Sequence, residues 1–228
     1  MFRAREANRI KKLDGPRRSP TSGGPARQLV MLLHGYGANG EDLIGLAPYM
    51  ARLVPDAAFV SPHAPERCAK QPTGYQWWGI ESFSPEERLE GAMRAAPVLD
   101  AFIDSELEKF GLDESSLALV GFSQGTMMAL HCGLRRERQV AAIIGYSGAL
   151  VAPDLLPDEI RAKPPVLLVH GDRDELLPAD STLEAVQGLS NVGVAVEWHF
   201  SAGAGHSIAQ DGLDLGTSFL ARALVGKL

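Results

Sequence analysis

The stretch Gly121-Phe122-Ser123-Gln124-Gly125, a Gly-x-Ser-x-Gly pentapeptide, decides the fold of this chain. Residues 117–120 before it are all apolar and predict a buried strand, whereas residues 126–132 after it contain no Gly or Pro and predict a helix. A strand, a tight turn and a helix form the context of a nucleophile elbow, whose glycines leave room for the adjoining strand and helix. A chance match in a chain with 24 glycines is the alternative, and the flanking segments argue against it. We therefore expect Ser123 to have strained backbone geometry and an exposed hydroxyl, with the Gln124 amide facing a developing oxyanion.

Apolar runs on both sides of the pentapeptide extend this pattern of strand and helix. Continuous runs predict buried strands at 28–34, 57–61, 140–147 and 166–170, and an alternating run predicts the last strand at 192–201. Helices are predicted at 42–53, 86–109, 181–188 and 208–225, with a kink at Pro97 in the second. Strands that alternate with helices predict an α/β fold, with a mostly parallel central sheet and helices on both faces.

Chemically capable groups follow the ends of four predicted strands. In parallel sheets the crevice at the carboxyl ends of the strands holds the site, so these groups are expected to lie close together. The order of serine, acid and histidine along the chain is that of α/β-hydrolases and differs from the orders found in unrelated serine proteases. We predict a nucleophile, an acid and a base, with two backbone amides as the oxyanion hole, in the order Ser123, Asp174, His206, Tyr36 and Gln124.

Other polar residues close to these positions are given structural roles. Asp172, two residues before Asp174, is expected to bond the backbone amides of its own turn. His34, at a strand end, is interpreted as a hydrogen-bonding residue and not as a base, and His199 as a residue on a strand face. A metal site is disfavoured because no second ligand cluster accompanies the candidate ligands His170, Asp172, Asp174 and Glu175.

Bulk properties narrow the classes of protein further. A chain of 228 residues can form one α/β domain with a sizeable core. The formal net charge of -6 argues against a nucleic-acid partner. The sequence contains no run of 18 apolar residues, so we expect no stable insertion into a membrane. Cys68 and Cys132 match no metal spacing, and they are interpreted as two reduced thiols, which favours the cytoplasm. The oligomeric state is left open, with a homodimer as the candidate assembly.

The first 27 residues differ from the rest of the chain. They are rich in Arg and Lys and contain no apolar stretch of the kind that follows the basic start of a secretory signal. We predict a loosely ordered basic extension at 1–27, with one short strand or arm docked on the body, and a catalytic domain at 28–228. Binding of the extension to an acidic surface is a further, weaker interpretation.

A long segment with several aromatic residues, 64–85, lies between predicted elements. Loops of this length are usually functional or disordered, and two tryptophans disfavour disorder. We interpret the segment as a wall of the substrate cleft, although aromatic side chains plugged into the core are nearly as good an explanation. The apolar residues expected to contact the acyl or alcohol chain are Trp78, Leu150 and Leu177.

Four motifs together resemble the phospholipase/carboxylesterase family of α/β-hydrolases, which includes acyl-protein thioesterases and small bacterial esterases. They are Leu33-His34-Gly35-Tyr36-Gly37, Gly121-Phe122-Ser123-Gln124-Gly125, His170-Gly171-Asp172-Arg173-Asp174 with Pro178, and Gly205-His206-Ser207. The resemblance covers residue 28 to the C-terminus and implies Asp174 as the triad acid and the amides of Tyr36 and Gln124 as oxyanion donors. The basic extension falls outside it. The pair Trp77-Trp78 is more similar to the aromatic segment of the bacterial members.

The resemblance and the residues together predict a serine carboxylesterase that cleaves short-to-medium acyl esters through an acyl-enzyme. No cofactor or metal is needed for this chemistry, and the expected partner is a small-molecule ester. Acyl-protein thioesterase and lysophospholipase activities stay open as alternatives. An acyltransferase and a non-catalytic binding protein with a hydrolase fold are two further alternatives, and the presence of Ser123, Asp174 and His206 argues against the second.

Overall fold

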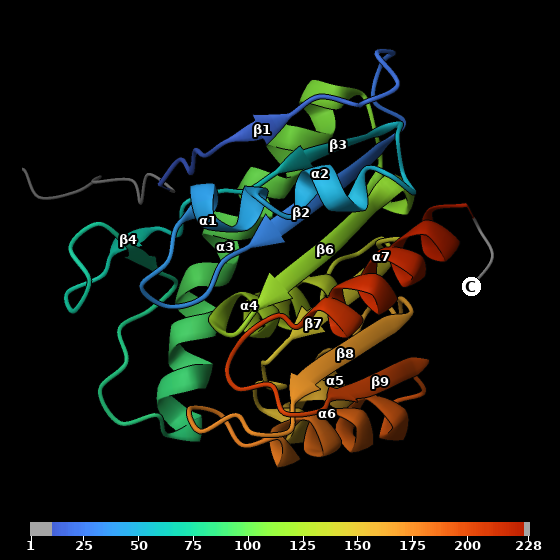
Figure 1. Cartoon of the computed structure of the whole chain (residues 1–228). Helices are drawn as coiled ribbons and strands as arrows, with labels where there is room; N and C mark the ends of the chain where they lie inside the picture. Colours follow the sequence, from blue (N-terminus) through green and yellow to red (C-terminus); the bar gives the residue numbers. More distant parts are fainter. Residues whose placement is uncertain (1–10, 226–228) are drawn as a thin grey trace, which may run out of the picture.

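A seven-stranded sheet forms the centre of the molecule in a computed structural model that describes residues 11–225 (Figure 1). The strand order is β1-β3-β2-β6-β7-β8-β9, and every neighbouring pair is parallel except β1 with β3. This architecture confirms the predicted α/β fold with a mostly parallel sheet. A separate two-stranded ribbon pairs β4 (Glu66–Arg67) with β5 (Tyr75–Gln76).

The strands of the sheet lie close to their predicted positions. They are β1 (Arg17–Arg18), β2 (Gln28–Leu33), β3 (Ala57–Val60), β6 (Leu117–Phe122), β7 (Ala142–Tyr146), β8 (Val166–Gly171) and β9 (Val196–Ser201). All residues of β3, β7 and β8 are buried, as continuous apolar strands covered on both faces should be. In β9, at the edge of the sheet, only Ser201 is fully buried, and Trp198 is 49% exposed, so the burial of this strand does not follow its alternating sequence.

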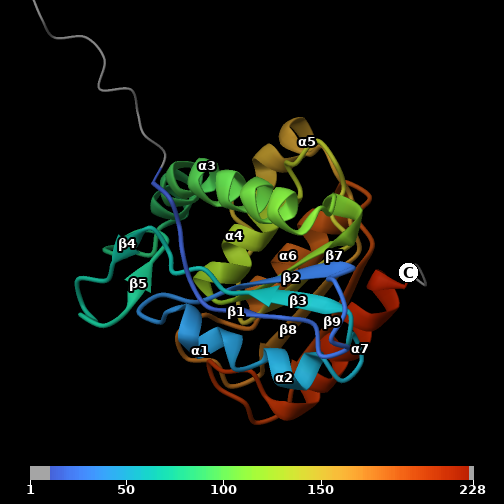
Figure 2. The same cartoon turned by 90° about the horizontal axis from the view of Figure 1, so that it is seen from above.

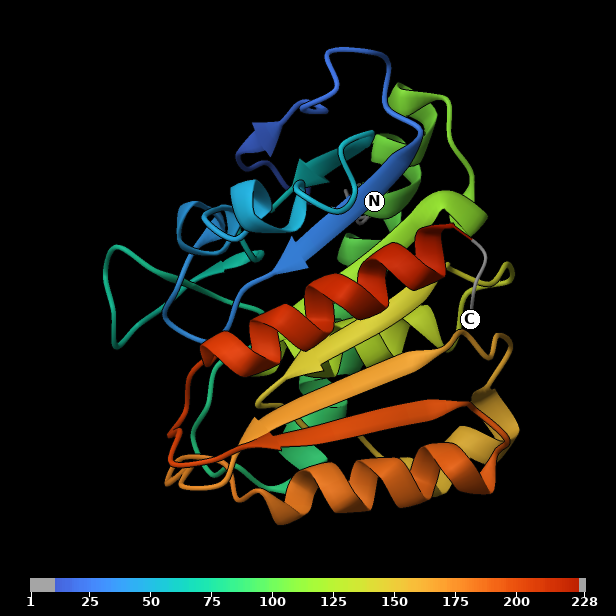
Figure 3. The same ribbon diagram turned by 45° about the vertical axis from the view of Figure 1, so that its right-hand side comes forward.

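Helices cover both faces of the sheet and divide the core into two layers (Figure 2). One layer contains α3 (Pro85–Phe110), α4 (Gln124–Gly133) and α6 (Asp180–Asn191), with the short α5 (Leu156–Glu159) nearby. The opposite layer contains α1 (Gly40–Ile44), α2 (Ala47–Met50) and α7 (Gln210–Leu224), and Figure 3 shows α7 lying across that face. Two 3-10 turns, η1 (Glu114–Ser116) and η2 (Pro153–Leu155), complete the elements.

The helix after the elbow, α4, is buried over its whole length. It packs between the sheet and α3, so apolar residues surround it on all sides and its sequence shows little amphipathic pattern. The long helix α3 begins at the cap Ser84, ends at Gly111 with φ 66°, and runs on through Pro97. Together these two helices fix the side of the sheet on which the elbow turns.

The prediction of one helix over 42–53 is wrong, because the structure contains two short helices, α1 and α2, in its place. Pro48 is the physical reason. It has no N–H to donate to the carbonyl of Ile44, and its ring would collide with that carbonyl in a continuous helix. The chain therefore begins a new turn at Leu46, with Pro48 in the first turn of α2, where no donor is required.

The described part of the N-terminal extension lies against the body. β1 pairs antiparallel with β3, and the Arg17 guanidinium binds the carboxylate of Glu106 in α3 through Nε at 3.0 Å and Nη2 at 2.6 Å. The predicted short strand docked on the body is thus present as β1. The first ten residues lie outside the described part of the chain, and the boundary after residue 27 stays a prediction. Over residues 11–225, no helix is long and apolar enough to cross a bilayer.

Candidate active site

The turn between β6 and α4 has the geometry of a nucleophile elbow. Ser123 has φ 54° and ψ -117°, a conformation that L-residues seldom adopt, and its N–H donates to the Tyr146 carbonyl at 2.8 Å. A Cβ at Gly121 would collide with the Gly125 carbonyl, and one at Gly125 would collide with the Leu33 carbonyl. The two glycines therefore allow α4 to turn back directly against the sheet, which lifts Ser123 above its edge.

Three side chains from three strand ends form one hydrogen-bonded chain. Nε2 of His206, in the loop after β9, lies 2.9 Å from Oγ of Ser123, which follows β6. Nδ1 of the same ring lies 2.6 Å from Oδ2 of Asp174, which follows β8. The structure thus brings together the three residues that the sequence singled out.

The carboxylate of Asp174 is held from several directions in a buried position. Its Oδ1 accepts the backbone N–H groups of Leu176 and Leu177, both at 2.9 Å, while Oδ2 faces His206. Burial by itself would raise the pKa of Asp174, but the Leu177 amide and His206 outweigh it and hold this pKa below its ordinary value. The group is therefore ionised at neutral pH and able to stabilise a positive imidazole.

Asp172 has a structural contact, although its partner differs from the predicted one. Its Oδ1 accepts the N–H of Gly203 at 2.6 Å, in the loop that precedes His206, and no contact to the amides of its own turn accompanies it within the described residues. The expected local turn is therefore wrong in its partner. The sequence could not show this, because Gly203 lies 31 positions away and reaches Asp172 only when β8 and β9 pair.

The backbone N–H groups of Tyr36, after β2, and of Gln124, directly after Ser123, have no acceptor among residues 11–225. Gly35 lies so close to the elbow that a Cβ there would be 3.1 Å from the Cβ of Ser123. The chain after β2 therefore passes directly beside the serine. Unpartnered donors at this place are suited to receive the charge of a tetrahedral intermediate.

The segment that contains Trp77 and Trp78 contacts both the chain before Tyr36 and the side chain of Gln124. The Trp77 indole Nε1 donates to the carbonyl of His34 at 2.9 Å. The Gln124 side chain accepts from the Trp77 amide and donates to the Trp78 carbonyl, both at 2.9 Å. Sequence reasoning assigned only the backbone of Gln124 and missed this role of its side chain. The glutamine directly after Ser123 was the one feature of the sequence that could have indicated this role.

The two other histidines considered in the sequence have local partners. In the ring of His34, Nδ1 faces the Gly35 carbonyl at 2.8 Å and Nε2 accepts the Ala64 N–H at 2.9 Å. Burial lowers the pKa of His34 to about 4, so the ring is neutral and occupied within the loop before Tyr36. His199, on β9, contacts Asp211 at the surface, 2.8 Å from Nε2 to Oδ2.

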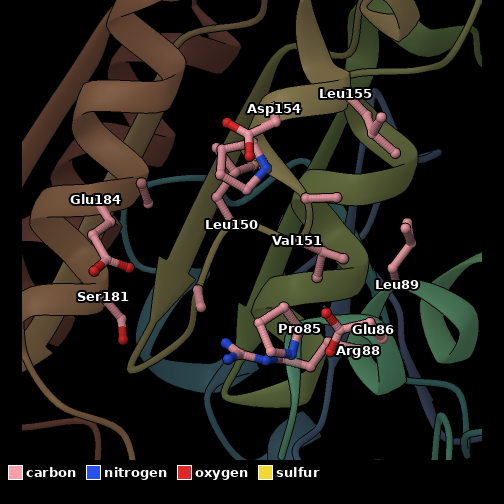
Figure 4. A pocket seen from close by; sticks show the side chains of 14 residues that line it. Pro85, Glu86, Arg88, Leu89, Leu150, Val151, Asp154, Leu155, Ser181 and Glu184 are labelled. Atoms are coloured by element: carbon pink, nitrogen blue, oxygen red, sulfur yellow. The ribbon is translucent and has the colours of Figure 1, made fainter.

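A cavity of about 460 Å³ lies between the first turns of α3 and α6 and the loop after β7 (Figure 4). Leu150 lines it, together with Leu89, Val151 and Leu155, and the Arg88 side chain extends into it from α3. Leu177 is not among its lining residues, and Trp78 is only 2% exposed, with its ring packed on Gly91 of α3. Of the three residues predicted to contact the substrate chain, only Leu150 faces this cavity.

Over residues 11–225, the structure contains no group of three His, Cys, Asp or Glu side chains that could bind a metal ion. His170, its first candidate ligand, uses both ring nitrogens within the protein, at 2.8 Å from Thr182 Oγ1 and at 2.9 Å from the Leu177 carbonyl. Cys68 and Cys132 are both buried and free.

The parallel sheet, the elbow after β6 and the order of serine, aspartate and histidine at strand ends define an α/β-hydrolase. Comparison with known proteins agrees and is more specific. The chain belongs to the phospholipase/carboxylesterase family, whose sequence model matches residues 20–224. This confirms the family predicted from the motifs.

Relatives of both activity types are similar to this chain. An esterase of Escherichia coli K12, YpfH, is 27% identical over 187 residues, which are 81% of this chain and 78% of the relative. Acyl-protein thioesterase 1 of Saccharomyces cerevisiae is 28% identical over 215 residues, 88% of this chain and 94% of the relative. The crystal structure of esterase PE8 superposes with a TM-score of 0.91 at 46% identity, covering 94% of this chain and all of PE8. The protein is therefore an enzyme, a hydrolase of the carboxylesterase and acyl-protein thioesterase type.

Proposed function

We propose that this enzyme is a serine carboxylesterase in which Ser123 is the nucleophile, His206 the general base and Asp174 the acid that orients it. The continuous chain of contacts from Asp174 through His206 to Ser123, at 2.6 and 2.9 Å, carries the proposal. These separations are those of a nucleophile and a base ready for proton transfer.

In the proposed reaction, His206 removes the Ser123 proton while Oγ attacks the ester carbonyl carbon. Asp174 keeps the imidazole in the tautomer with its lone pair toward Ser123 and stabilises the imidazolium that forms. The carbonyl oxygen becomes an oxyanion that receives the N–H groups of Tyr36 and Gln124, each contributing on the order of 3 kcal/mol. The imidazolium then protonates the departing alcohol, an acyl-enzyme remains, and water repeats the sequence to release the acid.

The proposed substrates are short-to-medium acyl esters. The cavity beside Leu150 is the proposed place for the acyl or alcohol chain, because Leu89, Leu150 and Val151 line it and its volume of about 460 Å³ lies within the sizes common for ligand pockets. Trp78 is withdrawn as a direct contact because its ring is buried against Gly91. Leu177, which is partly buried against the core, stays a proposed contact.

Thioester or lysophospholipid hydrolysis is the second candidate, and the similarity to acyl-protein thioesterase 1 over 94% of that relative favours it. Hydrolysis rates across acyl chain lengths, for oxygen esters and thioesters side by side, separate the candidates. We expect the highest kcat/KM for short or medium oxygen esters. A maximum for palmitoyl thioesters or long-chain lysophospholipids would contradict the proposed range. Product analysis with an added acceptor alcohol in which the transfer ester forms in place of the free acid would indicate a transferase.

The proposed nucleophile is tested by Ser123→Ala. Turnover should fall on the order of a million-fold while the far-UV circular dichroism spectrum stays unchanged. A fluorophosphonate probe should label the wild-type protein at Ser123 and should not label the variant. Labelling at a different serine, such as the buried Ser147 beside the elbow, would overturn the assignment.

We further propose the cytoplasm as the location, because the free thiols of Cys68 and Cys132 are suited to a reducing compartment. A small-molecule ester is the proposed partner. The assembly state, with a homodimer as the candidate, is decided by the mass of the protein in solution.

A further inference from the structure

A second histidine lies behind the proposed triad. His170, near the end of β8, is completely buried and does not contact Ser123 or His206. Its ring fills the space between the start of α6 and the loop 174–177. Nδ1 lies 2.8 Å from Thr182 Oγ1, and Nε2 lies 2.9 Å from the Leu177 carbonyl oxygen.

The neighbours of this ring determine where its proton is. Nε2 faces two oxygens, the Leu177 carbonyl and Oδ2 of Asp174, which is 3.1 Å away. A carbonyl and an ionised carboxylate can only accept, so Nε2 must carry a proton. In the tautomer protonated at Nε2 alone, Nδ1 is an acceptor, and the buried hydroxyl of Thr182, 2.8 Å away, is placed to donate to it.

Through this one ring, His170 acts on both oxygens of Asp174. It holds the Leu177 carbonyl, while the N–H of Leu177 donates to Oδ1 at 2.9 Å. Its polarised N–H also lies next to Oδ2, the oxygen that faces His206 at 2.6 Å. A rotation or tautomer change of His170 would therefore turn a lone pair toward the carboxylate and release the loop that fixes it.

We propose that His170, held in place by Thr182, is a positioning residue that orients Asp174 for the general base. The inference rests on the proposed triad and adds two residues behind Asp174: His170, whose Nε2 lies 3.1 Å from Asp174 Oδ2, and Thr182 in α6. His170 touches no substrate in this role, so its removal should lower kcat and leave KM nearly unchanged. In metal sites, mutation of a residue that hydrogen-bonds a ligand lowers activity about 10- to 100-fold, and we expect a decrease in kcat of similar size here.

Thr182 offers the sharper test, because Thr182→Val keeps the shape of the side chain and removes only the hydroxyl. We expect kcat to fall at least severalfold, KM to stay within about twofold, and Thr182→Ser to restore kcat. Thr217→Val is the matched control. Thr217 is equally buried, and its hydroxyl donates to the Leu213 carbonyl in α7 at 2.8 Å, away from the chain of contacts to Ser123. Its kcat should equal that of the wild-type protein.

A second pair of variants changes the ring itself. His170→Gln can place an amide N–H where Nε2 lies, whereas His170→Leu cannot, so the first should retain much more activity than the second. The rate of Ser123 phosphonylation by a fluorophosphonate should fall in the same order as kcat. This rate reports on activation of the nucleophile, which a loss of stability alone would not change in the fraction of protein that stays folded.

These measurements separate the inference from the function on which it rests. If the wild-type protein is not labelled at Ser123, or if Ser123→Ala stays active, the proposed triad is wrong. If Ser123 is the nucleophile but Thr182→Val and His170→Leu, folded by near-UV circular dichroism, keep wild-type kcat and labelling rates, the inference about His170 is overturned. Equal losses in Thr182→Val and Thr217→Val would also overturn it.

Discussion

At the scale of single residues, Asp172 and Asp174 show how two aspartates in one loop take different roles. Asp174 points inward to His206, and its other oxygen is fixed by two backbone amides. Asp172 lies at the surface and accepts the N–H of Gly203. Asp174 is therefore placed to stabilise a positively charged His206, whereas Asp172 connects the loop after β8 to the loop after β9.

The corresponding prediction compares Asp174→Asn with Asp172→Asn. The amide in place of Asp174 would favour the wrong imidazole tautomer, so kcat should fall by about four orders of magnitude. Asp172→Asn should keep turnover within a few-fold and cost about 1 kcal/mol of unfolding free energy, for one weakened hydrogen bond. Steady-state kinetics and thermal melts of both variants decide between the roles, and the opposite pattern would reverse the assignment of the acid.

At the scale of elements, the sequence predicted strands better than it predicted the segments between them. Apolar runs at 117–120 and 166–170 became β6 and β8, because a strand buried on both faces must be apolar throughout. Trp78 was harder to place, because an aromatic residue in a long loop suits a cleft wall and the core equally well. Only the packing of its ring against Gly91 reveals the second answer.

The candidate site followed the same division. Ser123, Asp174 and His206 could be predicted, because the carboxyl ends of parallel strands lie along one edge of the sheet. The supports of these residues could not be predicted. The Gln124 side chain, Thr182 and Gly203 make contacts with partners distant in the sequence, and no local pattern encodes such contacts.

The N-terminal arm yields a prediction at this scale. Glu106 is buried, and Arg17 is its closest cationic partner, so Arg17→Ala would leave a buried carboxylate poorly compensated. We expect a loss of about 1–3 kcal/mol in unfolding free energy. Arg18→Ala, at the exposed neighbouring position of β1, is the control and should be nearly neutral. Urea unfolding measures both, and equal effects would show that the ion pair does not fasten the arm.

At the scale of the whole molecule, two buried histidines connect stability to pH. Burial lowers the pKa of His34 and of His131 to about 4, below the ordinary value of 6.5. Between these values the unfolded chain binds more protons than the folded one, so the free energy of unfolding falls as the pH falls from about 6.5 to about 4. Each histidine contributes up to about 1.4 kcal/mol per pH unit.

Urea unfolding at pH 7.5, 6.0 and 5.0 tests this pH dependence. In His131→Leu one of the two titrating groups is absent, so the decrease in unfolding free energy between pH 6.0 and 5.0 should be smaller by up to about 1.4 kcal/mol. The comparison concerns the slope and is therefore independent of any change in stability at pH 7.5. An unchanged slope would contradict the role of His131.

The separation of Ser123 and His206 by 83 positions has a kinetic consequence. The two side chains meet only when β6, β7, β8 and β9 lie side by side in the sheet, and pairings between segments far apart in the sequence form slowly because long loops must close first. In a Trp198→Phe variant, whose remaining tryptophans are Trp77 and Trp78, ester hydrolysis should therefore return during refolding in the slowest phase, later than the change in tryptophan fluorescence. The return of catalytic activity thus reports when the whole sheet has formed, whereas a spectroscopic probe in one segment reports on that segment.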